Sequence, residues 1–388
     1  MNRSHFHIGV YCLAPYARTE RHIREIAECG IDFVTCMGYD RAALDLFSKY
    51  GLSAIVSGVV PGWFGGDGSN AGTMQLKNPL ERYRKAAETF ADHPAIWGID
   101  VGDEPSALDF AHYGEVIRLV DRLFPRAFAY MNLYPAYGLK ASGTEAEIRR
   151  QLGTDTYAEY IERYIQSVSA EYLSLDCYVY SSTPDVLYHT LSTAANACRR
   201  SGRSLWTVLQ VNSHDPEKWI SLNQLRFQGY AALCYGAEVI QWACYTAGWW
   251  HHQVLDEHGE KTQQYAKLQT VNAELKRIGE ARMRFECLDT QLIEETPWSA
   301  GVFESVHTVE NTPLLAGYMT ERVGDGQALM LCAADDPTGE NGTGLHVRFR
   351  CMRSVRVLDA DGERLLAPQA DGCYELFLSS CSGALVMV

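Results

Sequence analysis

Long apolar segments and an excess of basic residues are both missing from this sequence of 388 residues. No apolar run approaches the roughly 20 residues that a membrane-spanning helix needs. The N-terminal residues contain no apolar stretch of the signal-peptide type. The formal net charge is −14, which is unfavourable for binding nucleic acid or an anionic membrane. We therefore expect a cytoplasmic protein that binds neither.

Motifs for metals, cofactors and disulfides are also absent. The twelve cysteines form no CxxC pair and no cysteine–histidine spacing of the zinc type. Cys36 and Cys177 lie in apolar runs, where a free thiol packs as a small hydrophobic group. The pair His251-His252 has no third ligand at a helpful spacing, so we interpret it as part of an ordinary loop. We expect no metal and no cofactor.

Short apolar segments alternate with longer amphipathic segments over the first 283 residues. Eight segments are rich in Val, Ile, Tyr, Phe and Trp, and Gly, Pro, Asp or Ser bound them, so they are predicted strands. These strands are residues 6–13, 32–38, 52–60, 95–102, 127–133, 171–180, 205–212 and 238–246. A segment with helical periodicity follows each strand, and strict alternation requires parallel strands. Eight such units in roughly 250 residues are typical of a (β/α)8 (TIM) barrel.

The pattern changes after about residue 284. From there on, short alternating segments are separated by turn signals such as Gly-Asp-Gly, which predicts a small antiparallel β-sandwich. We therefore expect two domains, a barrel over residues 1–283 and a β-sandwich over residues 284–388. A doubly wound sheet is the alternative to the barrel, but no GxGxxG follows the first strand.

Polar and aromatic residues gather at the predicted ends of the barrel strands, where barrel enzymes have their active sites. Carboxylates follow the fourth strand, at Asp103 and Glu104, and lie near the end of the sixth strand, at Asp176. Fixed donors and acceptors suit sugar hydroxyls, and an indole can stack on the C–H face of a pyranose. The candidate substrate-binding residues are Trp63, Asn132, Tyr134, Tyr178, Gln210, Trp242, Trp249 and Trp250.

The segment Gly102-Asp103-Glu104-Pro105 resembles the strand-4 motif Asn-Glu-Pro of (β/α)8 glycoside hydrolases related to β-galactosidases. In that group the Glu is the general acid/base. The resemblance therefore implies this role for Glu104, with Asp103 in the place of the usual Asn. Trp242, near the end of the eighth strand, also matches the group, and so does the order of barrel and β-sandwich.

The seventh strand departs from this resemblance. The group has a nucleophilic Glu at the end of that strand, whereas the matching position here is Gln210, and an amide cannot act as that nucleophile. Other sugar-cleaving barrels pair acids from strands 4 and 6. We therefore favour Asp176 as the second carboxylate and keep Asp103 as a third candidate. The resemblance slightly favours retention over inversion of the anomeric centre.

Two structural expectations accompany these assignments. Pro105 disfavours the α conformation for the preceding residue, so Glu104 is expected to be extended. Alternation along the strand places Asp100 and Glu104 on one face and Asp103 on the other, unless the strand end twists. The loops after strands 3, 5 and 8 carry aromatic residues that are expected to close the barrel mouth into a blind pocket. These residues are Trp63, Tyr134, Tyr137, Trp249 and Trp250.

The leading function is hydrolysis of a small saccharide or glycoside. The first alternative is a catalytically inactive carbohydrate-binding barrel, which Gln210 motivates. The second is a non-hydrolytic barrel enzyme that acts on sugars, although the predicted strands contain no lysine for a Schiff base. The expected partner is a small carbohydrate. The identity of the sugar stays open, and the sequence allows a homo-oligomer.

Overall fold

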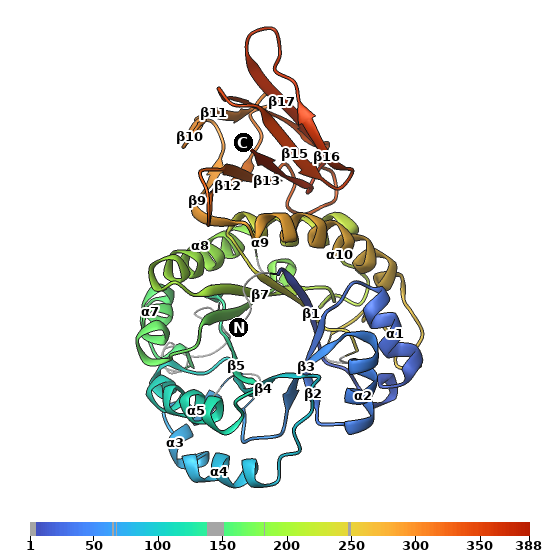
Figure 1. Ribbon diagram of the computed structural model, residues 1–388, viewed down its shortest axis with the longest axis vertical. Coiled ribbons are helices and arrows are strands. Elements are labelled where there is room, and N and C mark those ends of the chain that lie inside the picture. The colour runs from blue at the N-terminus through green and yellow to red at the C-terminus, as the bar shows by residue number, and fades with distance from the viewer. Residues whose placement is uncertain (1–4, 64–65, 67, 138–150, 182, 247–249) are drawn as a thin grey trace. The chain divides into compact units, whose positions relative to one another are not determined.

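The structure is a computed structural model that describes the chain except residues 1–4, 64–65, 67, 138–150, 182 and 247–249. Eight strands form a closed barrel in sequence order, and Figure 1 shows them as a ring with helices outside. They are β1 (His7–Tyr11), β2 (Phe33–Gly38), β3 (Ser53–Ser57), β4 (Ile96–Asp103), β5 (Phe128–Leu133), β6 (Tyr172–Cys177), β7 (Ser204–Gln210) and β8 (Val239–Ala243). The predicted (β/α)8 barrel is confirmed, with most strands shorter than predicted.

Helices follow the barrel strands as the periodicity predicts. The α-helices are α1 (Glu20–Glu28), α2 (Arg41–Tyr50), α3 (Met74–Lys77), α4 (Leu80–Glu88), α5 (Phe110–Leu123), α7 (Tyr157–Ser167), α8 (Pro184–Ser201), α9 (Leu222–Cys234) and α10 (Gln263–Arg282). Local signals explain several boundaries. For example, Asp40 accepts a hydrogen bond from the Ala43 amide at the start of α2, and Gly51 ends that helix in the left-handed conformation.

Aromatic side chains fill one layer of the barrel interior. Trp97 and Trp206 stack with ring centroids 5.4 Å apart, and Phe33 and Phe128 pack edge-on against Trp97 at 5.0 and 5.2 Å. Such layers are typical of the packed interior of these barrels. The next inward positions along β5 are Tyr130 and Asn132, so polar groups replace aromatic packing towards the carboxyl ends of the strands.

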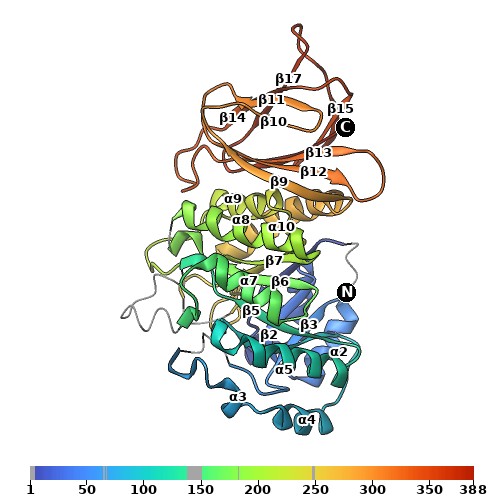
Figure 2. The ribbon, with the colours of Figure 1, turned by 90° about the vertical axis from the view of Figure 1, so that its left-hand side faces the viewer.

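The C-terminal strands form two antiparallel sheets, which appear together in the orange and red part of Figure 2. One sheet has the order β10-β11-β14-β17 and the other has the order β16-β15-β18-β13-β12-β9. The strands are β9 (Phe285–Ile293), β10 (Trp298–Ala300), β11 (Phe303–Thr308), β12 (Leu314–Glu321), β13 (Gln327–Ala333), β14 (Leu345–Arg350), β15 (Val355–Asp359), β16 (Gly362–Leu366), β17 (Cys373–Leu378) and β18 (Gly383–Met387). Both sheets contribute to one apolar core that includes Phe303, Leu331 and Phe349. The predicted β-sandwich is confirmed, but the first segment predicted as a strand begins at Ala300, so the sequence reasoning missed β9 and β10.

The chain divides into two compact units. One unit comprises His7–Pro216 and Gln241–Thr262, and the other comprises Glu217–Ile240 and Gln263–Val388 with the N-terminal segment that ends at Phe6. The predicted boundary between residues 283 and 284 separates α10 from β9 in sequence, and it stays a prediction. Within the described part of the chain, no helix has both the length and the apolar content needed to cross a membrane.

Candidate active site

A cavity of about 360 Å³ lies at the carboxyl ends of the barrel strands. Its walls combine carboxyl groups, phenols, thiols and one indole. The lining residues are Tyr11, Cys12, Cys36, Asp100, Gly102, Asp103, Glu104, Tyr130, Asn132, Asp176, Tyr178, Ala243, Cys244 and Trp250. None of these lining residues is Lys, Arg or His, so four carboxyl groups meet here without a cationic side chain. Among the described residues, no group of three His, Cys, Asp or Glu side chains is arranged to hold a metal ion.

Strand β4 brings three of the four carboxyl groups into this cavity. The pairing of β4 with β5 shifts register between Asp100 and Gly102, which marks an irregularity of the β-bulge type. Because of this shift, Asp100, Asp103 and Glu104 all line the same cavity. The expectation that Asp103 and Glu104 point to opposite faces is therefore wrong, since simple alternation does not hold across the shift.

The backbone of Glu104 is left-handed, with φ of 52°. The expectation of an extended conformation before Pro105 is wrong. Neighbouring hydrogen bonds hold the unusual conformation: the Glu104 amide donates to Asn132 O at 2.9 Å, and the Asp103 amide donates to Trp63 O at 2.8 Å. A non-glycine residue in this region costs about 1–3 kcal/mol, and such residues cluster at functional sites.

Asn132 holds two of the carboxyl groups. Its Nδ2 atom donates to Asp103 Oδ1 and to Asp176 Oδ1, each at 3.1 Å. Its Oδ1 atom accepts a hydrogen bond from the Ser174 hydroxyl at 2.9 Å. Although Asn132 lines the cavity as a substrate contact would, both ends of its amide are engaged within the protein. Asn132 therefore positions the carboxyl groups of Asp103 and Asp176.

A chain of hydrogen bonds across the barrel interior fixes Asn132 in turn. The hydroxyl of Tyr130 lies 2.9 Å from that of Ser174 and 2.6 Å from that of Tyr11. Gln241 Nε2 donates to the Tyr130 hydroxyl at 2.8 Å, and the Thr35 hydroxyl donates to Gln241 Oε1 at 2.6 Å. Fully satisfied buried networks of this kind give rigidity to a site.

The carboxyl groups of Glu104 and Asp176 lie beside each other in the cavity and interact. Burial, and then the charges of Asp176 and Asp103, raise the pKa of Glu104 well above its usual value. Burial and the charge of Asp103 also raise the pKa of Asp176, but hydrogen bonds from Asn132 and Tyr178 stabilise its charged form. Burial and mutual repulsion thus favour the protonated form of both groups, and the hydrogen bonds to Asp176 partly oppose this at Asp176.

Two of the predicted aromatic residues line the cavity. Tyr178 and Trp250 pack edge-to-face, with ring centroids 4.6 Å apart. Trp249 lies outside the described residues. Trp63 and Tyr134 do not line the cavity: the Trp63 indole donates to Gly66 O, and the Tyr134 hydroxyl accepts from Gln151 at 3.1 Å.

Gln210 and Trp242 are buried, with 1% and 0% exposure, and neither lines the cavity. Gln210 Oε1 accepts from the Tyr180 amide at 3.0 Å, and its Nε2 donates to Asn212 O at 3.0 Å. Gln241 points into the barrel interior, so its neighbour Trp242 points to the other face of β8. The structure does not bring these two side chains to the other candidates.

Two tyrosines and three thiols of the cavity escaped the sequence reasoning. Tyr130 lies two residues before Asn132, so strand alternation alone could have found it. Cys36, which we had interpreted as a packing residue, lines the cavity with Cys12 and Cys244. The hydrogen bond to Cys244 raises the pKa of Cys12, and the one to Cys12 raises the pKa of Cys36. Both thiols are protonated and are poor nucleophiles.

No model of a known protein family matches the chain, and no curated protein matches it in sequence. Among solved structures, an α-L-fucosidase candidate from Bacteroides thetaiotaomicron is similar, with a TM-score of 0.51 and 11% identity over 70% of this chain and 94% of that chain. A glycoside hydrolase family 5 mannosidase from Rhizomucor miehei has a TM-score of 0.47 and 11% identity over 72% of this chain and 95% of its own. At this identity the first likeness concerns the fold: the chain has a (β/α)8 barrel of the kind found in glycoside hydrolases.

Proposed function

We propose that the chain is a glycoside hydrolase that cleaves a small saccharide or glycoside, with Glu104 as the general acid/base. The observation that carries this proposal is the buried pair Glu104–Asp176, which two barrel strands bring together in one cavity. Glycosidases use two carboxyl groups beside the scissile bond, one protonated and one ionised. The mechanism requires a protonated Glu104 and an ionised Asp176, and two features favour this division: the charge of Asp176 raises the pKa of Glu104, and the hydrogen bonds from Asn132 and Tyr178 lower that of Asp176.

In this mechanism Glu104 protonates the leaving oxygen, and Asp176 attacks the anomeric carbon. Asn132 and Tyr178 donate hydrogen bonds to Asp176 and thereby stabilise its ionised form. We propose retention through a covalent intermediate, which the resemblance to the β-galactosidase-related group favours. In the substrate complex the two carboxyl groups would then lie about 5–5.5 Å apart, whereas inversion would need roughly 6.5–9.5 Å.

The cavity supports a small substrate. Its volume of about 360 Å³ is at the lower end of the roughly 300–1,000 Å³ that ligand pockets span. Tyr178 and Trp250 supply aromatic surface for a sugar ring. Because four carboxyl groups and no cationic side chain line the cavity among the residues that the structure describes, an anionic sugar such as a uronic acid is disfavoured. All twelve cysteines are free thiols, which supports the cytoplasm as the proposed location.

An inactive carbohydrate-binding barrel is the second candidate. One observation favours it: β7 supplies no carboxyl group to the cavity, and Gln210 is hydrogen-bonded to the surrounding backbone instead. A non-hydrolytic enzyme acting on sugars would use the same cavity. Hydrolysis assays separate these functions, since only the proposed hydrolase releases a sugar from a glycoside.

The test is a screen of aryl and alkyl glycosides with the wild-type chain and the Glu104→Gln variant. The variant should lose about 10²–10⁴-fold in rate on alkyl glycosides, whose poor leaving groups need a proton. It should lose much less on nitrophenyl glycosides. Glu88→Gln, a substitution at the end of α4 and outside the cavity, is the control. Normal hydrolysis of alkyl glycosides by Glu104→Gln would remove the assignment. Sugar binding without any hydrolysis would favour the inactive barrel.

A further inference from the structure

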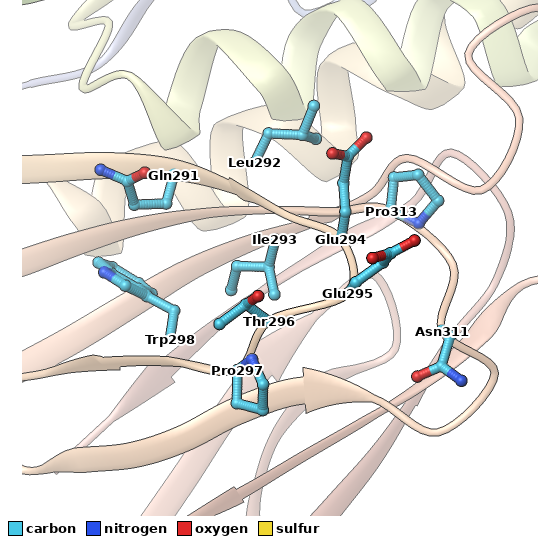
Figure 3. A pocket seen from close by; sticks show the side chains of 10 residues that line it. All are labelled: Gln291, Leu292, Ile293, Glu294, Glu295, Thr296, Pro297, Trp298, Asn311 and Pro313. Atoms are coloured by element: carbon cyan, nitrogen blue, oxygen red, sulfur yellow. The ribbon is translucent and has the colours of Figure 1, made fainter.

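A second concave surface, of about 610 Å³, lies in the C-terminal strands (Figure 3). Strand β9 is an edge of the six-stranded sheet, and β10 is an edge of the four-stranded sheet. Residues 294–297 connect these two edges, and they line the groove together with the end of β9, the start of β10 and the turn before β12. The groove therefore lies where the chain passes from one sheet to the other.

The groove combines an indole with polar groups. Trp298 is half-buried: part of the ring packs against the core of the sandwich, and the rest lines the groove. Figure 3 shows Trp298 and Gln291 on one side, and Glu295, Pro313 and Asn311 on the other. Among the ten residues that line the groove, none is Lys, Arg or His.

The carboxylates of this groove are available to a ligand. Glu294 and Glu295 are exposed, and neither forms an ion pair of 4.0 Å or less with any residue that the structure describes. Carboxylates only accept hydrogen bonds, so two of them favour a ligand that is rich in donors. The absence of a lining cation extends this preference to a positively charged ligand.

A saccharide with amino groups satisfies all of these features. The C–H face of a sugar ring can lie on the indole of Trp298, as apolar surface packs on an aromatic ring. Hydroxyl groups can bond to the amide of Asn311, and ammonium groups can bond to Glu294 and Glu295. A lysine-rich peptide could also pair with the carboxylates, but it has no rigid face to place on the indole.

We propose that this groove is a saccharide-binding site with a preference for sugar chains that carry amino groups. The site is built from residues other than those of the barrel cavity, so the proposal does not depend on hydrolysis. It assigns a ligand-binding role to the C-terminal β-domain.

The test uses the full chain with Glu104→Gln, so that any bound sugar remains intact during calorimetry. The probes are a β-1,4-linked glucosamine tetramer, the neutral cellotetraose and tetralysine. At low salt the glucosamine tetramer should bind about five-fold more tightly than cellotetraose, because each exposed charge pair contributes roughly 0.2–1 kcal/mol. Added salt should reduce this advantage.

Substitutions then locate the binding. The double change Glu294→Gln with Glu295→Gln should abolish the five-fold advantage and leave cellotetraose binding unchanged. Trp298→Ala should weaken both sugars by about ten-fold, through the loss of stacking. Glu286→Gln, an exposed residue of β9 outside the groove, is the matched control and should change neither. Because Trp298 also contacts the core, thermal melting checks that its variant is folded. If Trp298→Ala is unfolded, the double variant Glu294→Gln with Glu295→Gln tests the proposal instead.

Three results would overturn the proposal. The first is that neither tetramer binds. The second is binding that all groove variants retain, since the sugar would then occupy another site such as the barrel cavity. The third is tetralysine binding more tightly than the glucosamine tetramer, which would make the groove a peptide site. Equal affinity for the two tetramers would overturn the preference for amino groups.

Discussion

The fourth and seventh barrel strands each carry a polar residue to the same end of the barrel, but the two residues have different surroundings. Glu104, after β4, is left-handed and lines the cavity, where it lies beside Asp176. Gln210, at the end of β7, is buried and bonds to the Tyr180 amide, the Ser181 hydroxyl and Asn212 O. The second carboxyl group of the cavity thus comes from β6.

We infer from this difference that hydrogen-bond demand separates the proposed reactive position from a structural one. At Gln210 the surroundings offer one donor and two acceptors, which an amide satisfies and a carboxylate does not. At Asp176 the surroundings offer donors from Asn132 and Tyr178, which suit a carboxylate. We infer that the reactive carboxylate belongs on β6.

The largest expected effect is that of Asp176→Asn. This change removes the proposed nucleophile, so the rate of hydrolysis should fall on the order of 10³–10⁵-fold. Losses of this size are typical when one residue of a catalytic group that acts as a unit is replaced. With the smaller Asp176→Gly, added azide should restore part of the rate and produce a glycosyl azide of inverted anomeric configuration, because azide then takes the place of the nucleophile and displaces the leaving group in a single step. Full activity of Asp176→Asn would contradict the pairing of Glu104 with Asp176. The next candidates would then be Asp103 and Asp215, the first acid after β7.

Asn132→Ala should have the next largest effect. Losing the donor that orients both carboxyl groups should lower kcat by about 10²-fold, since small misplacements are costly. Donation by Asn132 lowers the pKa of Asp176, so the variant should have a higher pKa there. The acidic limb of the pH profile of kcat/KM should therefore move to higher pH. A fall in rate with an unmoved acidic limb would show a merely structural role.

Gln210→Glu tests the seventh strand directly. It restores the residue type of the resemblance, but the carboxylate would face Asn212 O and lose two donated hydrogen bonds. We expect no gain in activity and a loss of about 1–3 kcal/mol in the free energy of unfolding. Urea titration measures the loss, with the exposed Gln369→Glu as the control. A marked rise in hydrolysis would show that β7 still presents its residue to the substrate.

Asp100→Asn should give the smallest effect. Burial, together with the charge of Asp103, raises the pKa of Asp100 well above its unfolded value. The folded state then holds a proton that the unfolded state has released, so stability falls as the pH rises from the unfolded pKa towards the folded one. The variant should melt roughly 2–4 °C above the wild type at pH 8 for each kcal/mol gained. Its advantage should shrink at pH 5, and an equal advantage at both values would refute this assignment.

Hydrophobic patterning was sufficient to predict most of the fold. The eight barrel strands are compact apolar runs between helical periods, and such runs are recognisable without tertiary information. Strand β9 was missed because it is an edge strand with the polar residues Asp289, Thr290 and Gln291 in its middle. Its partners on β12, rather than its own pattern, make it a strand.

The site was predictable only in part. Asp103, Glu104 and Asp176 lie in one cavity as their strand order suggested, and their catalytic roles stay predictions. The left-handed Glu104 depends on hydrogen bonds to Asn132 and Trp63, two residues remote in sequence, so local preference before Pro105 pointed the wrong way. The amide of Asn132 serves two carboxyl groups, which no sequence pattern announces.

Trapping with a 2-deoxy-2-fluoro glycoside of the best substrate tests the Glu104–Asp176 pair most directly. The fluorine destabilises the oxocarbenium-like transition states and slows both chemical steps, and a dinitrophenyl or fluoride leaving group speeds the first step, so a covalent ester accumulates on the nucleophile. Peptide mass spectrometry of the trapped enzyme then identifies the esterified residue. The expected result is a single sugar on the peptide that contains Asp176. A label on Asp103, on Asp215 or on any β7 residue would contradict the β4–β6 pairing.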